Sequence, residues 1–225
     1  MGIVARRGSR PIFAVFAALA IPFFVAILSG CGSGGEPATV TSAAGCQEAE
    51  APEPKEVDLE APQQAVRAGE ELTAVVQTSC GTFEIALDTK RAPKIANSFA
   101  YLAEEGFYDG LDFNRVVSGF VVQGGDPLGD RTGGPGYTIV EKPPADTKYT
   151  RGVVAMAKSL DEPPGSAGSQ FFVVTSRDTG YPAEYALLGE VSKGYGVVDR
   201  INRLGTSREM PKQPVLIEKV TIEKG

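Results

Sequence analysis

The sequence predicts a mostly β domain, a closed barrel of short strands whose two openings are covered by α-helices. Two observations support this fold class. Short runs rich in Val, Ile, Leu and Phe repeat between residues 72 and 222, separated by glycine and proline clusters, which is typical of strands joined by turns. Helical spacing of apolar residues occurs near each end of this region. Closure would remove the exposed edges of so many strands, and the helices would then plug the ends.

The first half of the domain is expected to contain a hairpin, a helix and a longer strand. The hairpin is predicted because two apolar runs flank Cys80-Gly81. The helix is predicted because Pro93 suits a first turn, apolar residues follow at i, i+4 and i+7, and Gly106 supplies a stop. The expected elements are strands at 72–77 and 82–87, a helix from Pro93 to the stop at Gly106, a strand that opens at Phe113 and a structured loop at 124–137.

The second half alternates short strands with loops and ends in a helix and a strand. Val197, Val198 and Ile201 lie at helical spacing before a glycine stop. The expected elements are strands at 152–157, 170–175 and 185–191, a helix at 195–203 and a closing strand at 215–222.

Residues 1–30 are predicted to be a signal peptide that is followed by Cys31. Three arginines precede an apolar run from residue 12 to residue 28, and small residues follow it. Residues 28–31, Leu-Ser-Gly-Cys, resemble the bacterial lipobox, in which the cysteine is lipidated and becomes the new N-terminus. An uncleaved transmembrane anchor is the alternative. In both cases we expect an extracytoplasmic domain held at a bacterial membrane, and the lipobox predicts that a lipid on Cys31 is the anchor.

Residues 31–70 are predicted to be a disordered tether. The segment is rich in Glu, Pro and Ala, so it has too little apolar surface to offset the entropy of ordering. Two cysteines remain besides Cys31: Cys46 in the tether and Cys80 in the domain. Exported proteins meet oxidants, but the sequence leaves open whether these two cysteines form a disulfide or stay as free thiols.

The composition excludes several classes of function. The chain of 225 residues contains no histidine, which removes Ser-His-Asp and Cys-His nucleophilic sites and most zinc sites. A net charge of −6 argues against nucleic acid as a partner, because a protein needs basic patches to neutralise the phosphates. The glycine-rich stretches 124–126 and 133–136 lack the lysine-bearing helix start of a phosphate-binding loop, so we interpret them as turns.

Two segments carry polar side chains among apolar ones. They are residues 113–126, Phe-Asn-Arg-Val-Val-Ser-Gly-Phe-Val-Val-Gln-Gly-Gly-Asp, and residues 168–172, Gly-Ser-Gln-Phe-Phe. They resemble the signature strands of the cyclophilins, a family of peptidyl-prolyl cis-trans isomerases, and the resemblance extends over residues 72–223. It implies an eight-stranded antiparallel barrel with two capping helices over residues 71–225. It also implies an enzyme that needs no cofactor or metal and acts on proline-containing segments. The signal peptide predicts that these segments belong to exported proteins, and we expect a monomer.

Arg115 is the candidate catalytic cation. Rotation of an X–Pro amide breaks its resonance over a barrier of about 18–20 kcal/mol. The prolyl nitrogen of the twisted transition state accepts a hydrogen bond that the planar ground state does not, and this difference is what catalysis requires. Strand alternation would place Phe113, Arg115 and Val117 on one face, among apolar neighbours that lower the local dielectric. Gln123 would bind the substrate backbone and orient Arg115. Outside the motif, a lone arginine is usually a surface ion-pair partner.

The resemblance also implies the residues that seat the peptide. Two phenylalanines and a leucine, with a methionine beneath, would form the proline pocket, while an alanine and a glutamine would contact the extended chain. Tyr185 stands where the family often has a groove histidine, Asn114 replaces a histidine beside Arg115, and the chain has no tryptophan. The predicted substrate-binding set is Phe120, Met156, Ala157, Gln170, Phe172, Tyr185 and Leu188.

Two other functions remain open at this stage. The groove would serve a chaperone or scaffold if it bound proline-containing segments without turnover. The domain would be a structural envelope lipoprotein if it had no affinity for peptides. The presence of Arg115 favours the enzyme.

Overall fold

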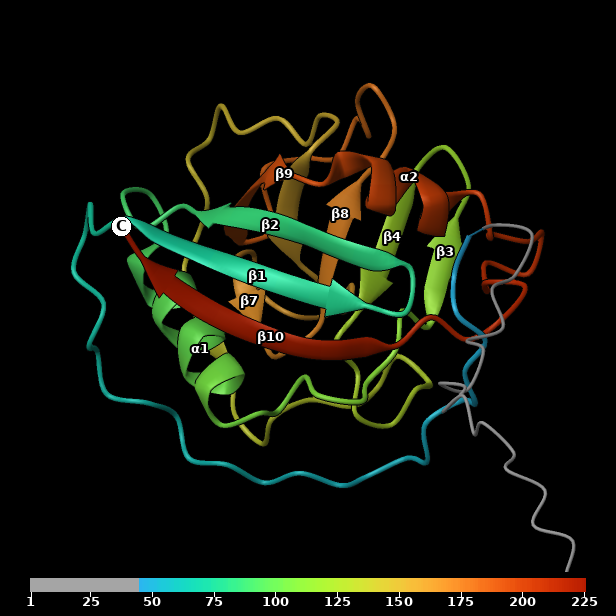
Figure 1. The fold of residues 1–225 in the computed structure, drawn as a ribbon. Coiled ribbons are helices and arrows are strands. Elements are labelled where there is room, and N and C mark those ends of the chain that lie inside the picture. The colour runs from blue at the N-terminus through green and yellow to red at the C-terminus, as the bar shows by residue number, and fades with distance from the viewer. Residues whose placement is uncertain (1–44) are drawn as a thin grey trace, which may run out of the picture. The chain divides into compact units, whose positions relative to one another are not determined.

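The computed structural model describes residues 45–225, so the signal peptide, the lipobox and Cys31 lie outside the described residues. The described part is built mainly from short antiparallel strands and carries two helices (Figure 1). In chain order the elements are β1 (Leu72–Thr78), β2 (Gly81–Leu87), α1 (Pro93–Glu104), β3 (Arg115–Val117), β4 (Val121–Gly124), β5 (Ile139–Val140), β6 (Val153–Met156), β7 (Ser166–Ala167), β8 (Phe171–Val174), β9 (Leu187–Lys193), α2 (Tyr195–Asn202) and β10 (Ile217–Lys224).

Eight strands form one curled sheet in the order β10-β1-β2-β9-β6-β8-β4-β3, and β5 pairs with β7 separately. Every pairing is antiparallel. The prediction of a mostly β fold with eight antiparallel strands and two helices is therefore confirmed. In Figure 1, α1 and α2 lie at different sides of the sheet, and both bury apolar side chains against it.

The predicted closure of the barrel is only partial. The edge strands β3 and β10 share no ladder, and a single bridge joins Asp112 to Leu216 just before them. Loop hydrogen bonds complete the contact, including those from the Phe113 amide to the Val215 carbonyl and from the Val116 amide to the Glu209 carbonyl, both at 2.9 Å. The physical reason is that β3 has only three residues and meets a loop on its free side.

The core places aromatic rings between α1 and the sheet. Phe99 from α1 stacks on Tyr108 with 4.8 Å between ring centroids, and it meets Phe171 of β8 edge-on at 5.6 Å. Phe113 lies 6.0 Å from Phe171 and is completely buried. The first turn of α1 is completed by a carboxylate, since the Ile95 amide donates to Glu141 Oε2 at 3.0 Å.

The strand expected from Phe113 onward is a hairpin. A turn at residues 118–120 separates β3 from β4, and Gly119 occupies it with a φ of 75°, a conformation that favours glycine. Phe113 and Val116 are buried while Arg115 is half-buried, so the alternation that would place Phe113 beside Arg115 is wrong. Phe113 lies before β3 begins and belongs to the core.

Residues 45–70, which we call the strap, follow the surface of the domain (Figure 1). The Lys55 amide donates to the Pro127 carbonyl at 2.9 Å and the Leu59 amide to the Pro135 carbonyl at 2.7 Å. Further along, the Asn97 side chain accepts hydrogen bonds from two strap amides, at 2.7 and 2.9 Å. The described part of the predicted disordered tether is thus an ordered segment. Its order comes from hydrogen bonds, from the disulfide and from Val57, Leu59 and Val66, which are partly buried against the core.

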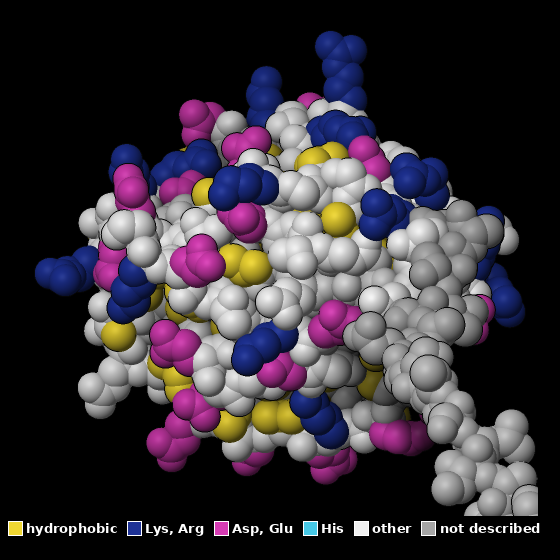
Figure 2. Space-filling view, viewed as in Figure 1, with side chains coloured by type: hydrophobic (Ala, Val, Ile, Leu, Met, Phe, Trp, Pro, Cys, Tyr) yellow, Lys and Arg dark blue, Asp and Glu magenta, His cyan; other side chains and the backbone are white. Residues whose placement is uncertain are grey.

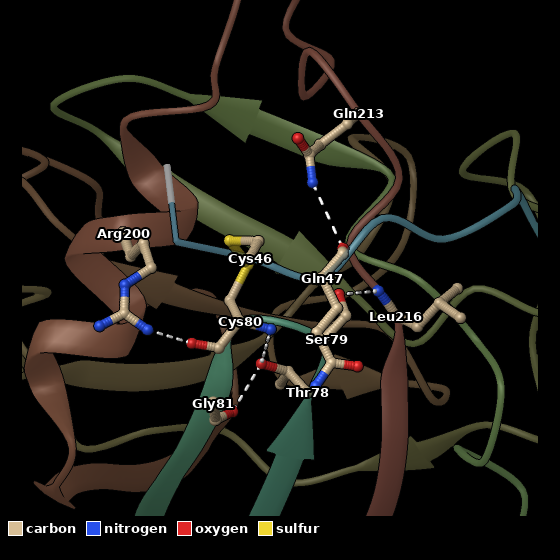
Figure 3. The surroundings of a disulfide bond; sticks show 9 residues. All are labelled: Cys46, Gln47, Thr78, Ser79, Cys80, Gly81, Arg200, Gln213 and Leu216. Atoms are coloured by element: carbon tan, nitrogen blue, oxygen red, sulfur yellow. Dashed lines mark hydrogen bonds between the residues drawn. A yellow bond between two sulfur atoms is a disulfide. The ribbon is translucent and has the colours of Figure 1, made fainter. Parts of the chain in front are cut away.

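The disulfide joins Cys46 to Cys80, which lies in the turn between β1 and β2 (Figure 3). Both cysteines are buried. The Arg200 guanidinium donates to the Cys80 carbonyl, and the Gln47 amide donates to the Ser79 carbonyl at 2.7 Å. The choice that the sequence left open is therefore settled in favour of a disulfide that pins the start of the strap.

The face of the molecule that is turned to the viewer in Figures 1 and 2 carries charges of both signs. Figure 2 shows Lys and Arg side chains interspersed with Asp and Glu, and hydrophobic side chains in small separate areas. Within residues 45–225, neither helix has the length and apolar character needed to cross a bilayer.

Candidate active site

Arg115 begins a chain of hydrogen bonds that runs from β3 through β4 to Gln170, the residue just before β8. It stands opposite Gln123 in the β3–β4 pairing, and its Nη1 donates to Gln123 Oε1 at 3.3 Å. Gln123 Nε2 donates to Gln170 Oε1 at 3.0 Å, and Gln170 Nε2 donates to the Gly133 carbonyl at 2.9 Å. Each glutamine amide is oriented by its neighbours, because its Oε1 accepts from one partner and its Nε2 donates to the next. The structure thus brings together three of the predicted site residues.

Glu209 holds the other side of the arginine, and the sequence did not point to it. Arg115 Nε donates to Glu209 Oε2 at 2.9 Å. The hydrogen bond and charge of Arg115 lower the pKa of the Glu209 carboxyl. Arg131 lies 3.7 Å from the same oxygen. Glu209 is 94 residues from Arg115 in the chain and follows α2, outside both signature segments, so no local pattern could have found it.

Phe172 lies at the centre of an aromatic cluster. Tyr185 meets its ring edge-on with 5.5 Å between centroids, and Tyr181 does so at 6.4 Å. The two tyrosines stack on each other at 4.9 Å, and Phe120 contacts Tyr181 at 5.4 Å. Three of the predicted pocket residues, Phe120, Phe172 and Tyr185, therefore belong to one cluster. Tyr181 was not in the predicted set, and together with Tyr185 it leaves Phe172 only 3% exposed.

The hydroxyl of Tyr149 fixes Tyr185 from below. It donates to the Tyr185 carbonyl at 2.5 Å and accepts from the Tyr185 amide at 2.9 Å. Burial raises the pKa of Tyr149 to about 12, so the hydroxyl keeps its proton at neutral pH and can donate. Tyr149 thus fixes the backbone of Tyr185, and with it the position of the Tyr185 ring in the aromatic cluster.

Met156 and Leu188 do not take the places predicted for them. Met156 pairs with Phe171, whose ring lies in the core. Ala155 is the β6 residue that pairs with Phe172, and on its other side it pairs with Leu187. Paired residues share a face of the sheet, so Leu187 stands in the row of Phe172. Leu188 is the extra residue of a register shift between β6 and β9 and is completely buried. A shift of this kind is invisible in the sequence.

A groove opens beside the polar chain. Its cavity of 1410 Å³ is reached by Arg115, Gln123, Ala157 and Gln170. The Ala157 amide donates to the Gln170 carbonyl at 2.8 Å, so this donor is already used within the protein. The remaining lining comes mainly from the loop after β4 and from residues 55–58 of the strap.

The Gly-Gly-Asp end of the first signature segment shapes the groove rim. A side chain at Gly125, where φ is 85°, would place its Cβ 2.7 Å from the Ser169 carbonyl oxygen, which only glycine avoids. The buried Asp126 carboxylate accepts from Asn114 Nδ2 and from the Leu128 amide, both at 3.0 Å. Asn114, which replaces a family histidine, therefore anchors the loop that borders the site.

Asp112 lies under the same loop. Its carboxyl is largely buried, and its Oδ1 has no hydrogen-bond partner among the described residues. Burial, followed by the charge of Asp126, raises the pKa of Asp112 to about 6. This carboxyl stabilises the fold best when it is neutral.

A half-buried arginine, two glutamines and an aromatic cluster on a curled antiparallel sheet are the features predicted for a site that binds extended peptides containing proline. Comparison with known proteins agrees. The profile described as "Cyclophilin type peptidyl-prolyl cis-trans isomerase/CLD" matches residues 73–222. The chain belongs to the cyclophilin-type peptidyl-prolyl cis-trans isomerases.

Relatives that are named as peptidyl-prolyl cis-trans isomerases are similar over most of their length. Peptidyl-prolyl cis-trans isomerase B of Streptomyces anulatus is 38% identical over 68% of this chain and 98% of its own. Probable peptidyl-prolyl cis-trans isomerase A of Mycobacterium bovis is 34% identical over 67% of this chain and 91% of its own. The crystal structure of a Cryptosporidium parvum cyclophilin type isomerase in the presence of the dipeptide Ala-Pro matches with a TM-score of 0.62 and 27% identity, over 68% of this chain and 99% of the other.

Proposed function

We propose that the protein accelerates the cis–trans exchange of X–Pro bonds in exported proteins by a noncovalent, electrostatic mechanism centred on Arg115. The observation that carries this proposal is the way the guanidinium is held. Glu209 binds Nε and Gln123 binds Nη1, while no described residue accepts a hydrogen bond from Nη2. One face of the arginine is thus fixed, and donors remain for a substrate.

The fixed cation acts on the transition state rather than on the substrate. The planar amide shares the nitrogen lone pair with its carbonyl, whereas the twisted amide leaves that pair on nitrogen. A donor aimed at the nitrogen therefore stabilises the twisted form more, which lowers the barrier. Because Glu209 and Gln123 orient the guanidinium beforehand, little reorganisation is needed when the amide twists. No covalent intermediate and no proton transfer is required.

The remaining groups have binding roles in this proposal. Gln123 and Gln170 would hydrogen-bond the peptide backbone, and Phe120, Phe172 and Tyr185 would seat the proline ring. The stacked tyrosines cover Phe172, so Tyr185 and Tyr181 must move aside as the ring enters. Side-chain rotations of this kind are fast compared with uncatalysed exchange, which takes tens to hundreds of seconds.

We place the protein outside the cytoplasm, anchored by a lipid on Cys31 and acting as a monomer. The lipobox-like residues before Cys31 support the anchor, and the Cys46–Cys80 disulfide supports an oxidising compartment. All the candidate site residues that the structure describes come from one chain, which supports a monomer.

A peptide-binding module with little turnover is the second candidate, and the covered Phe172 favours it. Exchange spectroscopy by NMR on an Ala-Pro peptide, with the full-length chain in detergent, separates the two. The enzyme predicts exchange far faster than in buffer at substoichiometric protein. Peptide binding without faster exchange would establish the module instead.

A further inference from the structure

The strap contributes to the groove although it lies outside the residues that match the family. The family profile begins at residue 73, yet residues 55–58 line the same cavity as Arg115, Gln123 and Gln170. The strap therefore adds to the groove a wall from outside the residues that match the family.

Two backbone hydrogen bonds hold the strap along the groove rim. They join Lys55 to Pro127 and Leu59 to Pro135, so residues 56–58 span the loop between these prolines. The packing is close, because a Cβ at Gly136, where φ is 97°, would lie 2.7 Å from Asp58 Oδ1 and 2.8 Å from its Cα. The same loop carries the Gly133 carbonyl that accepts the Gln170 side chain. The strap therefore contacts the same loop that binds Gln170, the last residue in the chain of hydrogen bonds from Arg115.

The strap presents negative charge to the groove. Glu56 and Asp58 are exposed, and none of the ion pairs within residues 45–225 includes either of them. The neighbouring Lys55 is turned to the domain, since its Nζ donates to the Phe107 carbonyl at 3.4 Å and lies 5.9 Å above the Phe107 ring.

The cations of the groove already have partners. Arg115 and Arg131 both approach Glu209. Lys158 donates to the carbonyls of Ser159 and Glu162, at 3.0 and 3.1 Å. The two strap carboxylates are therefore available to a cation that arrives with a substrate.

We propose that the strap is a specificity-determining wall of the substrate groove, and that Glu56 and Asp58 favour peptides carrying Lys or Arg within a few residues of the isomerised proline. The inference rests on the proposed isomerase function, because it concerns the same groove. The strap is held for this role by the Cys46–Cys80 disulfide and the contacts around it (Figure 3).

The test compares three peptides that differ only beside an Ala-Pro pair, where they carry Lys, Gln or Glu. Each is measured by NMR exchange and by titration with the full-length chain in detergent, its Glu56→Gln/Asp58→Asn variant and a matched control, Glu218→Gln/Glu223→Gln on β10. An exposed ion pair is worth about 0.2–1 kcal/mol. We therefore expect the ratio of kcat/KM for the Lys and Gln peptides to fall about 1.4-fold to fivefold in the strap variant only.

The outcomes separate the two proposals. An unchanged Lys-to-Gln ratio in the strap variant, or an equal fall in the control, overturns the strap inference while the isomerase stands. A second result is that the parent protein binds the peptides with a Lys preference that the strap variant loses, but catalyses no exchange. In that case the strap selects charged peptides for a binding module, and the isomerase proposal fails. Binding without any Lys preference in the parent overturns the strap inference outright.

Discussion

Removal of the disulfide should destabilise the domain substantially. Cys46 and Cys80 are 34 residues apart in sequence, and the bond closes this stretch in the unfolded chain as well as in the folded one. The loop-closure relation gives about 4 kcal/mol at 25 °C for a loop of this size. Because small domains are stable by roughly 5–15 kcal/mol, the loss would be a large share of the total.

The assay is equilibrium unfolding in guanidinium chloride, followed by far-UV circular dichroism, with and without reductant. The Cys46→Ala/Cys80→Ala variant and the reduced parent protein should show the same loss of free energy of unfolding, and reductant should not change the variant further. A loss below about 1 kcal/mol in both would refute the reasoning, since it would mean that the bond does not constrain the unfolded chain as the loop-closure relation requires.

Three further predictions follow from individual side chains. Asp112→Asn should be more stable than the parent at pH 8 by up to about 3 kcal/mol, with no difference at pH 4. The pKa of Asp112 is raised from 3.8 to about 6, so its favourable contribution to the free energy of unfolding is complete below its ordinary pKa and is lost as the pH rises through about 6. Equal gains in stability at both pH values, measured by urea unfolding, would contradict this. Glu209→Gln should lower kcat/KM severalfold at pH 7, because Arg115 loses its anchor. Since the pKa of Glu209 is lowered, the parent should approach the variant only as the pH falls below 4.5, and a parent profile that declines near neutrality would count against this role. Asn97→Ala removes two hydrogen bonds that strap amides donate to its side chain and should cost about 1–3 kcal/mol in the same unfolding assay, whereas a loss under about 0.5 kcal/mol would show that the strap is held elsewhere.

Much of the fold was predictable because its signals are local. The hairpin around Cys80-Gly81 and the helix that starts at Pro93 are specified by alternation, turn residues and helical spacing within a few residues. Arg115, Gln123 and Gln170 were found because the signature segments carry them in a fixed order, and cross-strand pairing brings that order together in space.

The errors and omissions arose where a residue depends on distant parts of the chain. The place of Leu188 was wrong because a register shift between β6 and β9 puts Leu187 opposite Ala155. Glu209 was missed because only the fold brings it to Arg115. The strap was expected to be disordered because its composition offers little apolar surface, whereas hydrogen bonds to residues far along the sequence, such as Pro127, and the packing of Val57, Leu59 and Val66 on the core hold it in place.

The claim that Arg115 stabilises the twisted amide is tested most directly by separating turnover from binding. Arg115→Ala is compared with Arg131→Ala, which removes a cation from the same groove that also approaches Glu209 but has no contact with Gln123. NMR exchange gives kcat and titration gives Kd for one Ala-Pro peptide. The account predicts that Arg115→Ala lowers kcat by about 10²–10³, with little change in Kd, while Arg131→Ala keeps its turnover. Unchanged turnover in Arg115→Ala, or a loss explained entirely by weaker binding, would contradict it.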